Sequence, residues 1–298
     1  MRATLTIAER ELRAYFTSPI GFVVLGGFLL ISAYFFLIPL IGPSHYGSFE
    51  MLLPNMTIWL IFLIPALTMR LVAEEKRSGS IELLATSPVT DAQIIFGKYL
   101  GVLGFYMVIL AATLQYVFGI AMVAKAEDVG RHLIWPGGTG IVLLAATLVA
   151  AVVAAATPGR RVAGWVAVGL ALATLIVLFL ARSVLPETGP LFTGYLGLFL
   201  LGAAFLGIGL LTSTLTRNQI VAYVVGVVIL LGMFLLSWLA GMYQDSWLGE
   251  TLSYLSVSEH LQHYAKGILD SRDIVLYLTW VAVTLFLSVR AMASGKSK

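Results

Sequence analysis

The stretch AEEKRSGSIELLATSPVTDAQIIFGK, residues 73–98, decides how the rest of the chain is read. It is the most highly charged stretch in a very apolar sequence, and long apolar runs flank it on both sides. A polar connector of this length exceeds what a tight turn between two membrane spans requires. We therefore interpret it as a structured connector between two spans.

Local sequence signals predict two short helices in this connector. Good helix formers fill its first half, and Pro88 disfavours helical geometry at Ser87, so we expect a break there. Thr90 followed three residues later by Gln93 forms a capping-box pattern. The second helix is predicted to start at this pattern and to continue into the next membrane span.

The connector, followed by Gly97-Lys98-Tyr99-Leu100, resembles that of ABC-2 type transporter permeases, and among them the branch that includes the gliding-motility permease GldF. In such permeases the connector is a cytoplasmic coupling helix that docks in a groove of a separate ATP-hydrolysing subunit. The resemblance implies an ATPase partner, which would bind the ATP, and no cofactor on this chain. The residues alone show only a charged, capped connector, which an ordinary solvated loop would also explain.

The resemblance places the ATPase contact in a coupling segment over residues 74–96. The residues expected to take part are Glu74, Glu75, Arg77, Ser78, Gly79, Ile81, Glu82, Leu83, Leu84, Ser87 and Pro88. The apolar members have no span of their own to pack in, and a partner's groove would recover roughly 1.5–3 kcal/mol for each side chain that it buries. We expect Glu75, Arg77 and Glu82 to form a polar rim around them.

The composition indicates an all-α polytopic membrane protein. Charged residues make up 11% of the chain and hydrophobic residues 59%, whereas soluble domains are about 25% charged. Several apolar runs approach the roughly 20 residues that cross a bilayer, and they do not alternate as barrel strands do. The absence of cysteine excludes disulfides and thiolate metal sites, and a net charge of +3 is too small to indicate nucleic-acid binding.

We predict about eight transmembrane helices within a single permease domain, residues 1–298. The expected spans are 21–41, 55–72, 97–124, 137–157, 162–182, 192–215, 219–242 and 274–293. The pair over 137–182 departs from the six-span family pattern. We interpret it as an inserted hairpin, which returns the chain to the same side of the membrane.

An amphipathic helix is predicted over residues 3–17, lying on the cytoplasmic leaflet. Its apolar face would consist of Leu5, Ala8, Leu12, Tyr15 and Phe16. A helix that caps the first span and a mechanical elbow both fit this pattern. Farther along, Gly97 and Gly101, with Gly104 on nearly the same face, predict close helix packing.

Two further segments match the family pattern. The turn Thr216, Arg217, Asn218 and Gln219 is expected at the cytoplasmic surface, with Thr216 and Gln219 as a capping box. The loop 243–273 is expected on the exterior, with a second capping box at Ser256 and Glu259. The amphipathic exterior helix that follows would place Leu261, Tyr264 and Ile268 at or in the outer leaflet.

The basic residues predict the orientation. In the eight-span arrangement, 13 of the 18 Lys and Arg residues lie on the side of the connector and of both termini. The other five are Lys125, Arg131, Arg182, Lys266 and Arg272. Because basic residues favour the cytoplasmic side, both termini are predicted inside a cytoplasmic (inner) membrane.

Searches for catalytic chemistry find no candidate residues. Gly295-Lys296-Ser297 lacks the upstream glycine of a phosphate loop, because position 290 is Arg. His260 and His263 do not form a zinc-protease motif, and no metal site is expected. Glu74-Glu75 lacks the arginine of a membrane-protease motif at position 79. Ionisable groups are missing from the span centres, which argues against ion-coupled transport.

These observations favour the permease subunit of an ATP-driven ABC-2 transporter with an unidentified substrate. Such permeases act in pairs, so a second copy or a related permease is expected as partner, together with membrane lipid. The alternative is a membrane subunit that uses ATPase motion mechanically, without transport, in a motility or envelope-assembly complex. A membrane enzyme is the third possibility.

Overall fold

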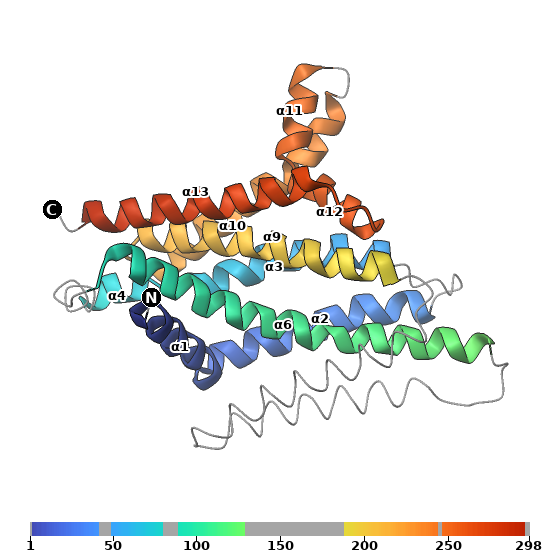
Figure 1. The fold of residues 1–298 in the computed structure, drawn as a ribbon, viewed down its shortest axis with the longest axis horizontal. Coiled ribbons are helices and arrows are strands. Elements are labelled where there is room, and N and C mark those ends of the chain that lie inside the picture. The colour runs from blue at the N-terminus through green and yellow to red at the C-terminus, as the bar shows by residue number, and fades with distance from the viewer. Residues whose placement is uncertain (1, 42–48, 80–88, 129–187, 244–245, 296–298) are drawn as a thin grey trace. The chain divides into compact units, whose positions relative to one another are not determined.

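The computed structural model describes residues 2–41, 49–79, 89–128, 188–243 and 246–295, and every described element is a helix (Figure 1). The helices are α1 (Arg2–Thr17), α2 (Pro19–Ile41), α3 (Phe49–Thr68), α4 (Ala73–Ser78), α6 (Asp91–Asp128), α9 (Thr188–Leu215), α10 (Gln219–Met242), α11 (Trp247–Leu255), α12 (Val257–Ala265) and α13 (Ser271–Gly295). The predicted all-α class is confirmed.

Five helical stretches in the described ranges are long and apolar enough to cross a membrane. They are Asn55–Ser78, Asp91–Leu114, Phe192–Leu215, Gln219–Met242 and Ser271–Ser294. The number rises to six if Ala3–Thr17 and Pro19–Phe35 together form one span. The protein is therefore a multi-pass membrane protein, while the predicted total of eight spans is not confirmed. The predicted hairpin over 137–182 lies outside the described residues.

The chain divides into two compact units. The first comprises Met1–Tyr15, Phe49–Tyr106 and Pro190–Lys298, and the second comprises Phe16–Ser48 and Met107–Gly189. The candidate sites lie entirely within the first unit. The described part of the second unit consists mainly of α2 and the far part of α6.

Helix α9 is the central helix of the first unit. The protein buries 83% of its membrane-spanning window, against 22% for α10 and 28% for α13. Its glycines permit this burial, because a methyl group added at Gly202 would lie 2.2 Å from the Tyr106 ring. One added at Gly209 would lie 2.2 Å from Thr68 Oγ1. Larger side chains at these positions would push the neighbouring helices away from α9.

Three predicted capping boxes had different outcomes. The box at the start of α6 is confirmed: the Thr90 N–H donates to Gln93 Oε1 at 3.1 Å, and the Gln93 N–H donates to Thr90 Oγ1 at 3.3 Å. The box at Thr216 is wrong, because Asn218 is the N-cap of α10 and its Oδ1 accepts from the Ile220 N–H at 2.9 Å.

Ser256 precedes α12 as predicted, but its hydroxyl makes no capping hydrogen bond. The segment before it also differs from the prediction, because α11 lies within the predicted exterior loop. Ser246 caps α11 by accepting from the Leu248 N–H at 3.2 Å. This N-cap serine is a local signal that could have identified the helix.

The glycine pattern of α6 packs against α1. A methyl group added at Gly97 would lie 2.7 Å from Ile7 Cβ, and one at Gly101 would lie 2.9 Å from the Ala8 carbonyl oxygen. The backbones of the two helices therefore approach directly at these positions. The predicted apolar face of α1 is only partly confirmed: Tyr15 is buried, whereas Leu5 is exposed.

Candidate functional site

The first part of the predicted coupling segment is a short helix of about one and a half turns. Helix α4 contains Glu74, Glu75, Arg77 and Ser78, and Gly79 ends it with a left-handed φ of 73°. Glycine suits this position because it adopts positive φ without a Cβ clash. The other predicted contact residues, Ile81, Glu82, Leu83, Leu84, Ser87 and Pro88, lie outside the described residues.

A buried lysine joins this helix to two others. Lys98 of α6 has a side-chain exposure of only 1%, and its Nζ lies 2.7 Å from Glu75 Oε1 and 3.0 Å from Glu11 Oε1. Arg10 of α1 reaches the same carboxylates, at 2.8 Å from Glu11 Oε1 and 3.3 Å from Glu75 Oε1. We call these four residues the Lys98 cluster.

The Lys98 cluster carries two positive and two negative charges, so it is formally neutral. Burial opposes ionisation of the Glu11 carboxyl, but Lys98 and Arg10 together hold its pKa below the ordinary value. Glu75 was predicted to lie in a polar rim around a partner's groove. The structure instead directs its Oε1 to Lys98 and Arg10, whereas Glu74 and Arg77 are exposed on α4.

Tyr15 adds a second link from α1 to the rest of the unit. Its hydroxyl donates to the Leu67 carbonyl oxygen at 2.7 Å, near the end of α3. Its ring stacks on Phe105 of α6, with centroids 4.9 Å apart, and the guanidinium of Arg70 lies 5.0 Å from the ring centroid. Helix α1 is therefore fixed to both α3 and α6.

The end of α9 holds the chain where it enters α4. Ser213 Oγ accepts from the N–H groups of Val72 and Ala73, each at 3.1 Å, and donates to the Met69 carbonyl oxygen at 3.0 Å. Lys76 Nζ also donates to the Thr214 carbonyl oxygen. These bonds attach the connector to the end of α9, immediately before the turn 216–219.

Within that turn, Arg217 and Asn218 are exposed, while Thr216 and Gln219 are half-buried. Thr216 Oγ1 donates to the Thr212 carbonyl oxygen at 3.3 Å, so its hydroxyl continues the end of α9 instead of capping α10. The sequence predicted the turn but gave no signal for Ser213, which attaches the end of α9 to the connector.

The predicted exterior helix corresponds to α12. Leu261 and Tyr264 are buried within the protein, so they do not form a lipid-facing surface. Ile268 is 52% exposed and lies beyond the helix, because Gly267, with φ of 82°, ends it. The Ile268 N–H donates to the His263 carbonyl oxygen at 2.9 Å and the Gly267 N–H to that of Tyr264 at 3.1 Å, which is a Schellman motif.

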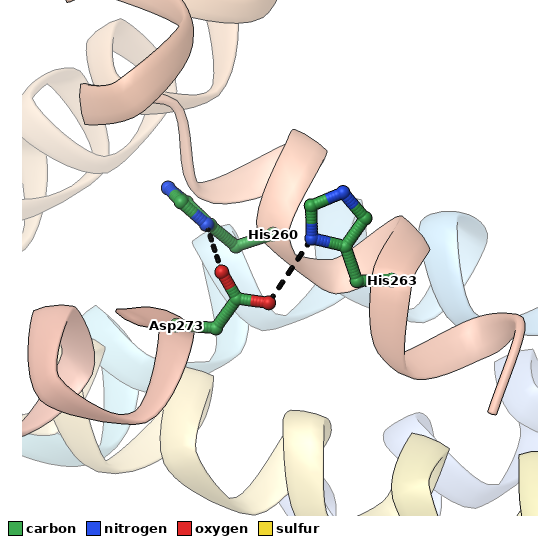
Figure 2. A group of neighbouring side chains, drawn as sticks. All are labelled: His260, His263 and Asp273. Carbon is green, nitrogen blue, oxygen red and sulfur yellow. Dashed lines mark hydrogen bonds and ion pairs between the residues drawn. The ribbon is translucent and has the colours of Figure 1, made fainter. Parts of the chain in front are cut away.

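Helix α12 also presents two histidines to one carboxylate (Figure 2). His260 Nδ1 lies 2.5 Å from Asp273 Oδ1, and His263 Nδ1 lies 3.1 Å from Asp273 Oδ2. The other ring nitrogen of His260, Nε2, lies 2.8 Å from the Tyr254 carbonyl oxygen. We call His260, His263 and Asp273 the histidine cluster.

The histidine cluster borders a cavity of about 300 Å³. The lining residues are Glu250, Ser253, Tyr254, His260, His263, Asp270, Arg272 and Asp273. Both histidines were visible in the sequence, but they predicted no metal site. Asp273 was not predicted, because no short motif links the histidines to a carboxylate in the first turn of the following helix.

The two clusters lie at opposite ends of α9. Near its start, Thr193 Oγ1 donates to the Tyr264 carbonyl oxygen of α12 at 2.6 Å. Near its end, Ser213 binds the connector. Twenty residues separate these two contacts, which at 1.5 Å per residue is about 30 Å, the thickness of a bilayer's hydrocarbon core. The residues that attach the connector and α12 to α9 therefore lie about one bilayer thickness apart along that helix.

Comparisons with known proteins agree with the membrane architecture. The family model described as ABC-2 family transporter protein matches residues 37–258, which is most of the chain. No curated protein matches the sequence. The match covers α3, α4, α6, α9, α10 and α11, including the helix that carries Glu75 and the α9 terminus that carries Ser213. The chain therefore belongs to the ABC-2 family of transporter proteins.

Proposed function

We propose that this chain is the permease subunit of an ATP-driven ABC-2 transporter, and that its coupling segment, residues 74–96, receives motion from a separate ATPase subunit. Family membership supports the permease assignment, because ABC-2 permeases typically work with an ABC ATPase. The basic-residue bias supports a cytoplasmic connector and cytoplasmic termini. The substrate is left unnamed.

The observation that carries the coupling proposal is the Lys98 cluster. It ties Glu75 of α4 to Lys98 of α6 and Glu11 of α1 through ion pairs of 2.7 and 3.0 Å. Ser213 ties the residues just before Glu75 to α9. A displacement of α4 would therefore reach three helices at once, which an ordinary solvated loop could not achieve.

The exposed apolar faces of α10 and α13 support pairing with a second permease or contact with lipid. Only 22% and 28% of their spanning windows are buried within this chain. In the proposed complex, two permease chains and two ATPase subunits work together, and these faces provide the area for permease–permease and permease–lipid contacts.

Substituting Leu83→Asp and Leu84→Asp together tests the coupling proposal. The two charges should prevent burial of both side chains in a partner's groove, and the ATPase should be lost on co-purification in detergent. The matched control is Ile268→Asp with Leu269→Asp, two residues that are 52% and 51% exposed at the opposite end of the unit. The control should retain the ATPase at the same membrane level of permease.

Undiminished co-purification of the Leu83/Leu84 variant, with unchanged ATPase activity, would contradict the coupling assignment.

Reconstituting the complex in liposomes distinguishes transport from the mechanical alternative. Substrate-stimulated hydrolysis with accumulation of the substrate supports transport. Hydrolysis that moves no lipid, peptide or saccharide across the membrane supports mechanical use.

A further inference from the structure

We propose that His260, His263 and Asp273 bind a divalent transition-metal ion of the zinc class at the membrane surface opposite the connector. The donor set is two imidazole nitrogens and one carboxylate oxygen, which are ordinary zinc ligands. The three ligand atoms lie within 4.8 Å of one another. This proposal does not depend on the proposed transport function.

Hydrogen bonding around His260 assigns different roles to its two ring nitrogens. The Tyr254 carbonyl oxygen can only accept, so His260 Nε2 is the donor in their 2.8 Å contact. The other ring nitrogen, Nδ1, lies only 2.5 Å from Asp273 Oδ1. A metal ion between these two atoms would accept an electron pair from each of them.

The contact with Tyr254 is also the arrangement that supports a metal-binding histidine. Such histidines usually donate their second ring N–H to a carboxylate or a backbone carbonyl, which fixes the ring and frees the first nitrogen. His260 does this through Nε2, and its Nδ1 points toward Asp273 (Figure 2). His263 directs its own Nδ1 to the other carboxylate oxygen. One ion between these atoms could satisfy both rings.

Binding one ion requires side-chain shifts of about an ångström. Zinc–ligand bonds of about 2.0–2.2 Å in a tetrahedron separate neighbouring ligand atoms by about 3.3 Å. The nitrogen–oxygen separations are 2.5 Å from His260 to Oδ1 and 3.1 Å from His263 to Oδ2, and the three ligand atoms lie within 4.8 Å of one another. The His260 contact would open by less than about one ångström, and the widest pair would close by up to about 1.5 Å. With Asp273 only 2% exposed, its carboxylate is held in place by the start of α13.

The surrounding cavity favours a cation. Its lining contains the carboxylates of Glu250, Asp270 and Asp273, against the single guanidinium of Arg272. Three protein ligands leave a fourth coordination position for water or a small ligand from the cavity. Because the histidines belong to α12 and Asp273 to α13, a bound ion would cross-link these two helices.

Metal binding to the purified full-length chain in detergent, with any affinity tag removed, tests the proposal. After treatment with EDTA, the protein is titrated with Co²⁺, and Zn²⁺ is added to displace it. We expect one equivalent of Co²⁺ with the visible bands of a four-coordinate ion, loss of those bands with Zn²⁺, and a higher Tm in Zn²⁺ than in EDTA.

Three variants locate the site. His263→Ala removes a side chain that is 48% exposed, so the fold should survive, and it should weaken Zn²⁺ binding at least about tenfold. Asp273→Asn should weaken binding similarly. Gln262→Ala, exposed on the same helix, is the matched control and should bind like the unsubstituted chain.

Unchanged Zn²⁺ affinity in both His263→Ala and Asp273→Asn would place any bound metal elsewhere and overturn the proposal. Absence of saturable Zn²⁺ uptake by the unsubstituted chain would also overturn it. A failure of this experiment leaves the co-purification test of the ATPase contact unaffected.

Discussion

The two ends of α9 bury charge in contrasting ways. At the connector end, Lys98 is 1% exposed, and together with Arg10 it balances the charges of two carboxylates. At the other end, Asp273 is 2% exposed and faces two imidazoles beside a cavity. The first cluster is therefore formally neutral through its own side chains, whereas the second presents its donor atoms to a cavity.

This difference separates a structural role from a binding role. A neutral cluster that joins three helices favours one arrangement of those helices, and loss of one of its members leaves uncompensated buried charge. In the proposed metal site, the cation comes from the cavity and is not a side chain of the fold. We therefore expect substitutions at the two ends of α9 to have effects on stability that differ in size and in cause.

The largest effect is expected for Lys98→Met. The substitution leaves Glu11 and Glu75 with only Arg10, and loss of one partner of a buried ion pair costs about 3–5 kcal/mol. The free energy of unfolding, measured by denaturant titration in mixed micelles, should fall by that amount. Glu9→Gln is the control, because Glu9 pairs with Arg13 at the exposed surface, and it should change the value by less than about 0.5 kcal/mol. Equal effects would contradict the contrast between buried and exposed charge.

An intermediate loss of stability is expected for Gly101→Ala, which tests how closely α1 packs against α6 beside the Lys98 cluster. The added methyl group would lie 2.7 Å from Glu11 Cβ and 2.9 Å from the Ala8 carbonyl oxygen. Overpacking of this kind costs about 1–3 kcal/mol. Gly232→Ala in α10 is the matched control, because nothing lies within 4 Å of the added methyl group.

The Gly232 variant should be unchanged or more stable, by up to about 1 kcal/mol, since alanine is the better helix former. The comparison is read from thermal unfolding of both proteins in the same detergent. A Tm for Gly101→Ala at or above that of Gly232→Ala would show that α1 does not sit directly on α6.

The smallest effect on stability is expected for Asp273→Asn, measured in EDTA so that metal binding does not contribute. The amide retains an oxygen acceptor and gains a donor, and neutral imidazoles can use both, so the loss should be about 1 kcal/mol. The measurement is again the denaturant midpoint in mixed micelles. A loss as large as that of Lys98→Met would show that the histidine cluster is as structurally essential as the Lys98 cluster.

Much of the fold could be read from local signals. The long apolar runs predicted α3, α6, α9, α10 and α13, because a membrane span needs a continuous hydrophobic helix. Thr90 and Gln93 located the start of α6, since a capping box is complete within four residues. The N-cap of α10 was predicted at Thr216 instead of Asn218, because both residue types can cap a helix. Only the backbone geometry decides between them.

The candidate sites could be read only in part, since their decisive contacts are long-range. Glu11 and Lys98 are 87 positions apart, and Ser213 lies 141 positions from Val72. Nothing in the local pattern distinguishes Glu11 from the solvated charges beside it on α1. Asp273 was missed for the same reason, although its 10- and 13-residue separations from the histidines are short.

The position of Lys98 also determines the order in which the chain can assemble. Helix α1 is synthesised before the rest of the cluster. Arg10 lies beside Glu11 from the start, but Lys98, the buried partner of Glu11, follows 87 residues later, after Glu75. The buried ion pair that joins α1 to α6 therefore cannot form until the connector and the start of α6 have been synthesised.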